Sequence, residues 1–135
     1  MKDNVPMVDH RLCRLSVRDD ELELAGPPAA LRALSRLLRQ HAAPVEVAVT
    51  GGVVSQKVTA GPLLVSLEGG TTLRLTGGRE CLDIIWGALD GLAEQAETAD
   101  DRTVHRHLHI EHSPGDEYRS PDSVPLIIVA DWPEV

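Results

Sequence analysis

Short runs in which apolar and polar residues alternate recur along most of the chain, and each run predicts a β-strand. They lie at residues 12–18, 22–24, 45–50, 53–59, 63–68, 73–75 and 105–111. In the first run Cys13, Leu15 and Val17 share a face, and in the last Leu108 and Ile110 are expected to point inward. Residues 124–130 are nearly all apolar instead, which predicts a central strand buried on both faces.

Two segments have the three- and four-residue spacing of an amphipathic helix. The first begins after Gly26-Pro27, with Leu31, Leu34 and Leu38 toward the core. The second is expected at about 79–97. Its apolar stripe is Leu82, Ile85, Trp86, Leu89, Leu92, Ala93 and Ala96.

The chain also repeats itself. Five residues of the first half recur in the second at a constant offset. They are Leu22, Leu24, Gly26, Leu31 and Leu38, which align with Leu73, Leu75, Gly77, Leu82 and Leu89. Each copy predicts strand, turn, strand and helix, with pseudo-repeats at about 12–50 and 63–111. We therefore expect one α+β domain over 1–135, a mostly antiparallel sheet with two helices on one face, built from a duplicated ββα unit. Residues 1–10 are expected to be a flexible lead.

The amino-acid composition and net charge limit the classes of molecule that the protein is expected to bind. The 135 residues include no Phe, one Tyr and two Trp, so the core must be aliphatic, and the formal net charge is −8. That charge argues against nucleic acid and favours a basic protein partner. The sequence shows no secretory signal and no apolar run of the ~20 residues that span a membrane. Cys13 and Cys81 lack metal-ligand spacing and are expected to be reduced. We expect a cytoplasmic location.

Three histidines alternate along the strand at 105–111. His105, His107 and His109 share a face with Glu111. Neighbouring members lie ~6.6 Å apart, so His107 and His109 could bind one zinc ion if another strand supplied a third ligand. Nothing in the sequence marks that ligand, so we expect a solvent-facing row without metal, and no cofactor. The alternative is that this histidine row contacts a protein partner.

The second helix carries a row of carboxylates opposite its apolar stripe. Its members are Glu80, Asp83, Asp90, Glu94 and Glu97, with Gly87 in the one gap. Like charges at this spacing repel, so the row costs the helix a little stability. It is either a solvated outer face or a docking surface for a basic protein. Arg32, Arg36 and Arg39 of the first helix would neutralise part of it if the helices lie side by side.

No nucleophile elbow, phosphate-binding loop or dinucleotide fingerprint occurs in the sequence. Gly69-Gly70 and Gly77-Gly78 are not followed by Lys-Ser/Thr, so they predict a turn and a helix start. We therefore expect a protein without catalytic activity.

From Leu63 to Val129 the chain resembles a family of bacterial polymorphic toxin systems, immunity protein family 32. The shared features begin with Leu73-Arg-Leu-Thr-Gly-Gly, an amphipathic helix and a His-x-His-x-Glu strand at 107–111. A Pro-Gly pair at 114–115 and Pro-Asp-Ser-Val-Pro-Leu at 121–126 follow. The resemblance implies a non-catalytic α+β protein that binds and neutralises a cognate toxin, commonly a nuclease with a basic cleft.

Both surfaces identified from the residues fit that role. The expected partner-binding residues are Glu80, Asp83, Asp90, Glu94, Glu97, His107, His109 and Glu111. Two alternatives from other classes stay open. One is a small metal-binding or regulatory protein that uses the histidine strand. The other is a structural domain that forms a homodimer through a sheet edge.

Overall fold

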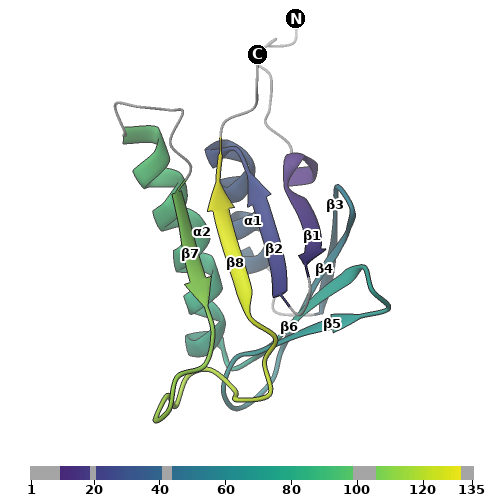
Figure 1. Cartoon of the computed structure of the whole chain (residues 1–135), viewed down its shortest axis with the longest axis vertical. Coiled ribbons are helices and arrows are strands. Elements are labelled where there is room, and N and C mark those ends of the chain that lie inside the picture. Colours follow the sequence, from purple (N-terminus) through teal and green to yellow (C-terminus); the bar gives the residue numbers. More distant parts are fainter. Residues whose placement is uncertain (1–9, 19–20, 41–43, 99–105, 132–135) are drawn as a thin grey trace, which may run out of the picture.

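The computed structural model describes residues 10–18, 21–40, 44–98 and 106–131, and its strands and helices follow the order β-β-α-β-β twice (Figure 1). A 3-10 turn at His10–Leu12 precedes the first set. That set is β1 (Arg14–Arg18), β2 (Glu21–Gly26), α1 (Pro28–Gln40), β3 (Val45–Val49) and β4 (Gly52–Val58). The second set is β5 (Leu64–Glu68), β6 (Thr72–Gly77), α2 (Arg79–Thr98), β7 (Arg106–Ile110) and β8 (Leu126–Ala130). The repeated unit is therefore longer than ββα.

The strands form two four-stranded sheets, whereas the sequence predicted one. Sheet A has the order β1-β2-β8-β7 and sheet B the order β3-β4-β6-β5. Each sheet takes one hairpin from each repeat. The hairpins are antiparallel, and the central pairs β2–β8 and β4–β6 are parallel. The α+β class with mostly antiparallel pairing is confirmed, but the hairpin that follows each helix pairs with the other repeat.

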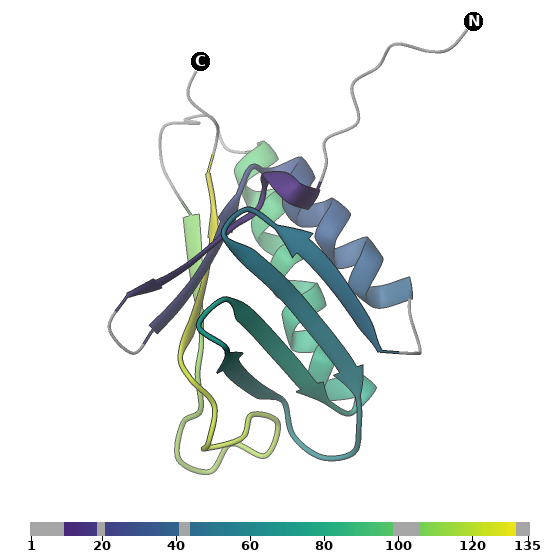
Figure 2. The ribbon, with the colours of Figure 1, turned by 90° about the vertical axis from the view of Figure 1, so that its right-hand side faces the viewer.

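Both helices lie in the angle between the two sheets. Figure 1 looks onto sheet A with the helices behind it, and Figure 2, a quarter turn away, looks onto sheet B, again with the helices behind. The two helices also pack against each other. The apolar stripes predicted from the sequence are buried. They include Leu31, Leu34, Leu38, Leu82, Trp86 and Leu89. Among the described residues, neither helix has the length and apolarity that crossing a membrane requires.

The two repeats occupy equivalent positions in the two sheets. Leu22 pairs with Leu126 in sheet A as Leu73 pairs with Val54 in sheet B. The same register makes Ile128 of β8 the counterpart of Gln56 of β4. The correspondence between the two repeats, which the sequence predicted, thus extends to the strands after each helix.

Sheet A departs from the sequence prediction in strands β7 and β8. Leu108 is 43% exposed because β7 is an edge strand, although it was expected to point inward. Val17, on the other edge strand, is also 43% exposed. Strand β8 is not buried on both faces: Leu126 and Ile128 are buried, whereas Ile127 and Val129 are only partly covered. Helices cover the inner face of sheet A, and its outer face is open.

The turn between β3 and β4 joins the two sheets. The Thr50 amide donates to the Cys13 carbonyl (2.9 Å), and the Leu15 amide donates to the Thr50 carbonyl (2.9 Å). Gly51 has a φ of +88°, and a Cβ there would lie 2.5 Å from the Leu15 carbonyl oxygen. Only glycine permits both the positive φ and this close approach of the β1 backbone.

One polar bridge crosses the otherwise apolar core. Gln56 of β4 is 1% exposed. Its Nε2 donates to the Leu38 carbonyl near the end of α1 (2.8 Å), and its Oε1 accepts a hydrogen bond from Trp86 Nε1 of α2 (2.9 Å). Ser35 Oγ also donates to the Trp86 carbonyl (3.3 Å). Sheet B is therefore hydrogen-bonded to both helices, and every polar end of the Gln56–Trp86 pair has a partner.

Replacing Gln56 with leucine is expected to lower the free energy of unfolding by about 1–3 kcal/mol, because the buried Trp86 N–H loses its acceptor. Urea unfolding measures the change. The double variant Q56L/W86F removes both partners and is expected to lose less than the sum of the single changes. Strictly additive losses would contradict the bridge. I128L, at the counterpart position in sheet A, serves as the control and is expected to cost under about 1.5 kcal/mol.

Candidate functional site

All five carboxylates of the acidic row lie on the side of α2 that faces away from the core. Glu80, Asp83, Glu94 and Glu97 are exposed, and Asp90 is partly buried. The apolar stripe opposite them packs against β6, β7 and β8 and against α1. The amphipathic pattern therefore positions the row as the sequence predicted.

Two of these carboxylates form ion pairs with α1. Arg39 Nη2 lies 2.6 Å from Asp90 Oδ2, and Glu97 Oε1 accepts hydrogen bonds from Arg32 Nη2 (2.5 Å) and Nε (2.9 Å). Such pairs at the surface stabilise by only about 0.2–1 kcal/mol each. They nevertheless neutralise part of the row, which was one of the alternatives from the sequence. Within the described segments, Arg36 and the three remaining carboxylates take part in no ion pair.

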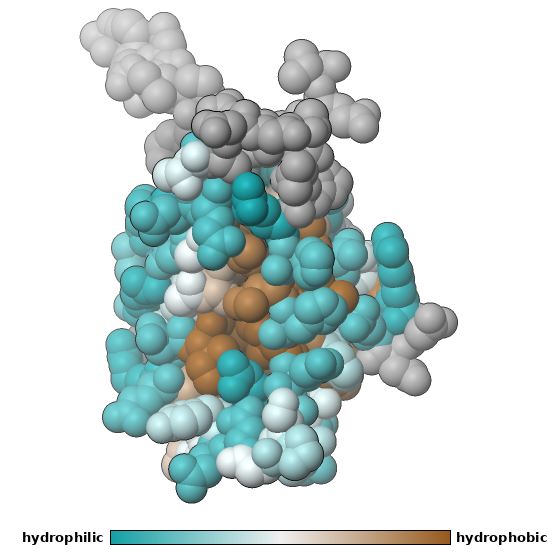
Figure 3. Space-filling view, turned by 60° about the vertical axis from the view of Figure 1, so that its left-hand side comes forward, coloured by the Kyte–Doolittle hydropathy of each residue, from teal (hydrophilic) through white to brown (hydrophobic). Residues whose placement is uncertain are grey.

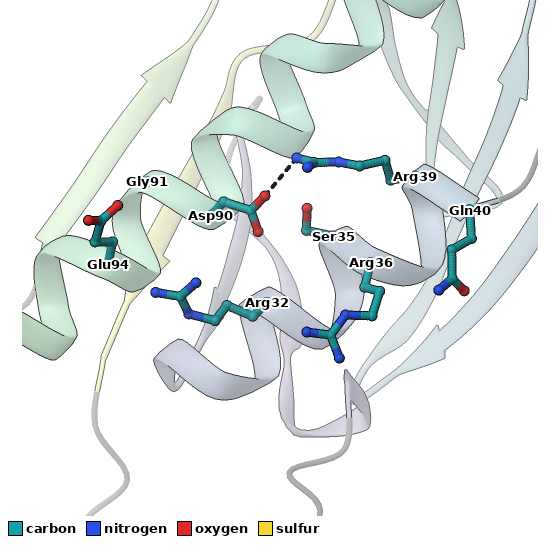
Figure 4. A pocket seen from close by; sticks show the side chains of 8 residues that line it. All are labelled: Arg32, Ser35, Arg36, Arg39, Gln40, Asp90, Gly91 and Glu94. Carbon is teal, nitrogen blue, oxygen red and sulfur yellow. Dashed lines mark hydrogen bonds and ion pairs between the residues drawn. The ribbon is translucent and has the colours of Figure 1, made fainter.

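A groove of about 370 Å³ runs between the two helices (Figure 4). Its basic side comes from Arg32, Arg36 and Arg39 of α1, and its acidic side from Asp90 and Glu94 of α2. Figure 4 shows Arg39 reaching across to Asp90 over Ser35. The groove is polar, and its opposite charges already face one another.

Two positions on the outward side of α2 are occupied by glycine. Gly87 fills the gap in the acidic row, and Gly91, one turn later, lines the groove. A Cβ at either position would meet nothing within 4 Å. Packing therefore does not require glycine here.

The outer face of sheet A is the second surface. His107 and His109 are exposed on β7, with ring centroids 5.3 Å apart at an interplanar angle of 81°. Glu111 follows the strand and is also exposed. His105 lies outside the described residues. In the part of the chain that the structure describes, no three His, Cys, Asp or Glu side chains come together as a metal site.

A hollow of about 490 Å³ lies on this face. Ala25 of β2 with Ile127 and Val129 of β8 form an apolar part of its lining. The polar part is Arg18, Glu23, His107, His109 and Asp131. Figure 3, which views the molecule from the side that carries α2 and β7, shows apolar side chains gathered in the middle with polar ones around them. By the residues that line the hollow, the face predicted as a polar, solvated sheet surface has an apolar centre.

Asp131 lies at the end of this hollow and is 9% exposed. Its Oδ2 forms an ion pair with Arg14 Nη2 of β1. Its Oδ1 is buried and accepts no hydrogen bond from any residue that the structure describes. A buried carboxylate oxygen without a donor is costly.

The loop before β8 is held by Asp116. Its Oδ1 accepts hydrogen bonds from the Tyr118 amide (2.8 Å) and the Arg119 amide (3.2 Å), and its Oδ2 accepts one from Arg119 Nη1 (3.0 Å). The Tyr118 amide contributes most to holding the pKa of Asp116 below its ordinary value, and Arg119 adds to the effect. The Ser120 amide donates to the Leu63 carbonyl (2.7 Å), which ties the loop to the start of β5.

The predicted partner-binding residues fall into two groups that the structure does not bring together. The carboxylates of α2 lie in the helix layer, and His107, His109 and Glu111 belong to the outer face of sheet A, with the sheet between them. Sequence reasoning missed Ala25, Ile127, Val129 and Asp131. The signal was present, because the uninterrupted apolar run at 124–130 places apolar residues on both faces of β8, and the helices cover only one of them.

Replacing Gly87 or Gly91 with alanine is expected to raise the free energy of unfolding by about 0.5–1 kcal/mol each, because alanine favours helix and both sites are open. Gly77→Ala is the contrasting variant. Its φ is +144° and its Cβ would lie 2.9 Å from the Pro62 carbonyl oxygen, so it is expected to destabilise. Urea unfolding compares the three. A loss at Gly87 or Gly91 would contradict the open space.

Comparison with protein-family models matches residues 21–51 and 72–131 to the family described as immunity protein 32. The matched ranges contain both helices and strands β2, β3, β6, β7 and β8, so the likeness extends into the first repeat. Comparisons with curated proteins and with solved structures gave no match. Since the matched residues make up more than half of the chain, it belongs to the immunity protein 32 family.

Proposed function

We propose that this protein binds a cognate toxin of its own bacterium and blocks it stoichiometrically, without catalysis. The observation that carries the proposal is the family match, which spans both repeats and bears the description of an immunity protein. An inhibitor of this kind needs a stable scaffold with an exposed surface complementary to its target. The open face of sheet A and the exposed side of the helix layer both offer such a surface.

The negative net charge of the protein supports a basic toxin as the partner, such as a nuclease with a cationic cleft. The formal net charge of −8 creates a field that attracts a basic partner over the Debye length of about 8–10 Å. Glu80, Asp83 and Glu94 contribute most freely on α2, because Asp90 and Glu97 are paired with arginines. Long-range attraction of this kind accelerates encounter more than it slows dissociation.

The function is tested with the toxin domain encoded by the gene beside that of this protein. Co-expression with the active toxin is expected to restore growth. A catalytically inactivated form of the same domain is expected to bind the purified protein one to one, measured by calorimetry. A toxin domain that kills equally well with and without this protein, and that shows no binding heat, would refute the proposal.

Reversing Glu80, Asp83 and Glu94 to lysine is expected to slow association with that toxin about tenfold at low salt. Each reversal changes the charge by two, so the formal net charge goes from −8 to −2. The dissociation rate is expected to stay unchanged. Stopped-flow measurements across a salt series report both rates, and the difference between variant and wild type is expected to shrink as salt rises.

A matched variant separates the acidic row from the net charge. Glu46, Glu117 and Asp122 are exposed and lie away from α2. Their reversal to lysine changes the net charge equally. Equal slowing by both triple variants would show that the row on α2 has no special part in steering.

A further inference from the structure

The apolar centre of the outer face of sheet A is not explained by the fold. The central strands of this sheet point Ala25, Ile127 and Val129 outward, on the face that the helices do not cover. In an antiparallel or mixed sheet with one solvated face, outward positions are normally polar. Apolar side chains on such a face mark contact with another molecule when polar residues surround them.

The second repeat supplies an internal comparison. Because β2 pairs with β8 as β6 pairs with β4, the outward residues of the two sheets correspond one to one. The counterparts of Ile127 and Val129 are Ser55 and Lys57. Ala25 corresponds to Thr76. Sheet B has the same strand order and register with these polar residues, so the architecture does not require apolar ones.

Asp131 also differs from the residue at the corresponding position beside sheet B, which is Thr59. The Asp131 amide donates to the Gly26 carbonyl (2.9 Å), as the Thr59 amide donates to the Gly77 carbonyl (2.8 Å). Thr59 is an exposed residue, whereas Asp131 is nine-tenths buried beside the apolar centre with Oδ1 unsatisfied. A carboxylate at the edge of the apolar centre favours a cationic group in a molecule that covers this face.

We propose that the outer face of sheet A is the surface that docks the toxin. On this reading, which rests on the proposed function, an apolar side chain of the toxin packs over Ile127 and Val129. A lysine or arginine of the toxin donates to Asp131, and His107 and His109 close the β7 side of the contact. An apolar centre within a polar rim is the arrangement that concentrates binding energy in protein interfaces.

Charge favours a basic toxin over a second copy of this chain. Arg14 and Asp131 pair with each other on this face, and the remaining Glu21, Glu23 and Glu111 outnumber Arg18. Two copies placed face to face would bring these carboxylates together, which is unfavourable. In the groove between the helices, by contrast, Arg32 and Arg39 are already paired with Glu97 and Asp90.

The test exchanges the outward residues of one sheet for those of the other. The double variant Ile127→Ser, Val129→Lys gives sheet A the residues of sheet B. It is expected to weaken binding of the inactivated toxin domain about 100-fold, mainly through faster dissociation. The reciprocal variant Ser55→Ile, Lys57→Val is expected to leave the Kd within about twofold. Thermal unfolding checks that both remain folded.

A second variant keeps the test decisive if the first is unstable. His107 and His109 are exposed, so H107A/H109A leaves the core intact and is expected to weaken binding about tenfold. Wild-type affinity in both sheet A variants would overturn the docking surface while leaving the proposed function standing. No binding by the wild-type protein would overturn both. A dimer in sedimentation that only I127S/V129K abolishes would assign the face to a second copy instead.

Discussion

The fold depends on one constraint, which is that neither repeat completes a sheet by itself. Each contributes one hairpin before its helix and one after it, and the two hairpins enter different sheets. The parallel contacts β2–β8 and β4–β6 join the repeats at the centre of both sheets. Because β2–β8 connects segments at opposite ends of the described chain, its formation carries a high loop-closure entropy that the aliphatic core must offset. The helices are then held in the angle that the two sheets make.

The sequence predicted the elements well and their assembly only in part. Periodicity identified both helices and the buried positions on them, because helix packing leaves a pattern that survives in a single chain. The repeat of Leu22 and Leu24 as Leu73 and Leu75 identified the symmetry. The partner of each hairpin was not predictable, since alternation shows that a strand has an inner face and not which strand lies beside it. One sheet was therefore expected where two exist.

The candidate surfaces were predictable to a similar extent. A charge row on a helix follows from spacing alone, so the carboxylates of α2 are where they were expected. Their pairing with Arg32 and Arg39 depends on the contact between the helices, which spacing does not fix. The apolar centre of sheet A was misread because apolar residues on both faces of β8 suggested full burial. Alternation and apolar runs show that a face is apolar and not what covers it, so the sequence alone did not distinguish a buried face from an open one.

The pairing of hairpins from different repeats determines how much of the chain must be synthesised before the protein can fold. Leu22 must wait for Leu126 before sheet A has its central pair, so nearly all the described chain has to be made first. Until then sheet A consists of β1 and β2 alone, and a two-stranded sheet is marginal in water. The outer face of sheet A takes residues from both ends of the fold. A ribosome that stalls before β8 therefore leaves a chain with neither a closed core nor that surface, so truncated products are expected to be degraded.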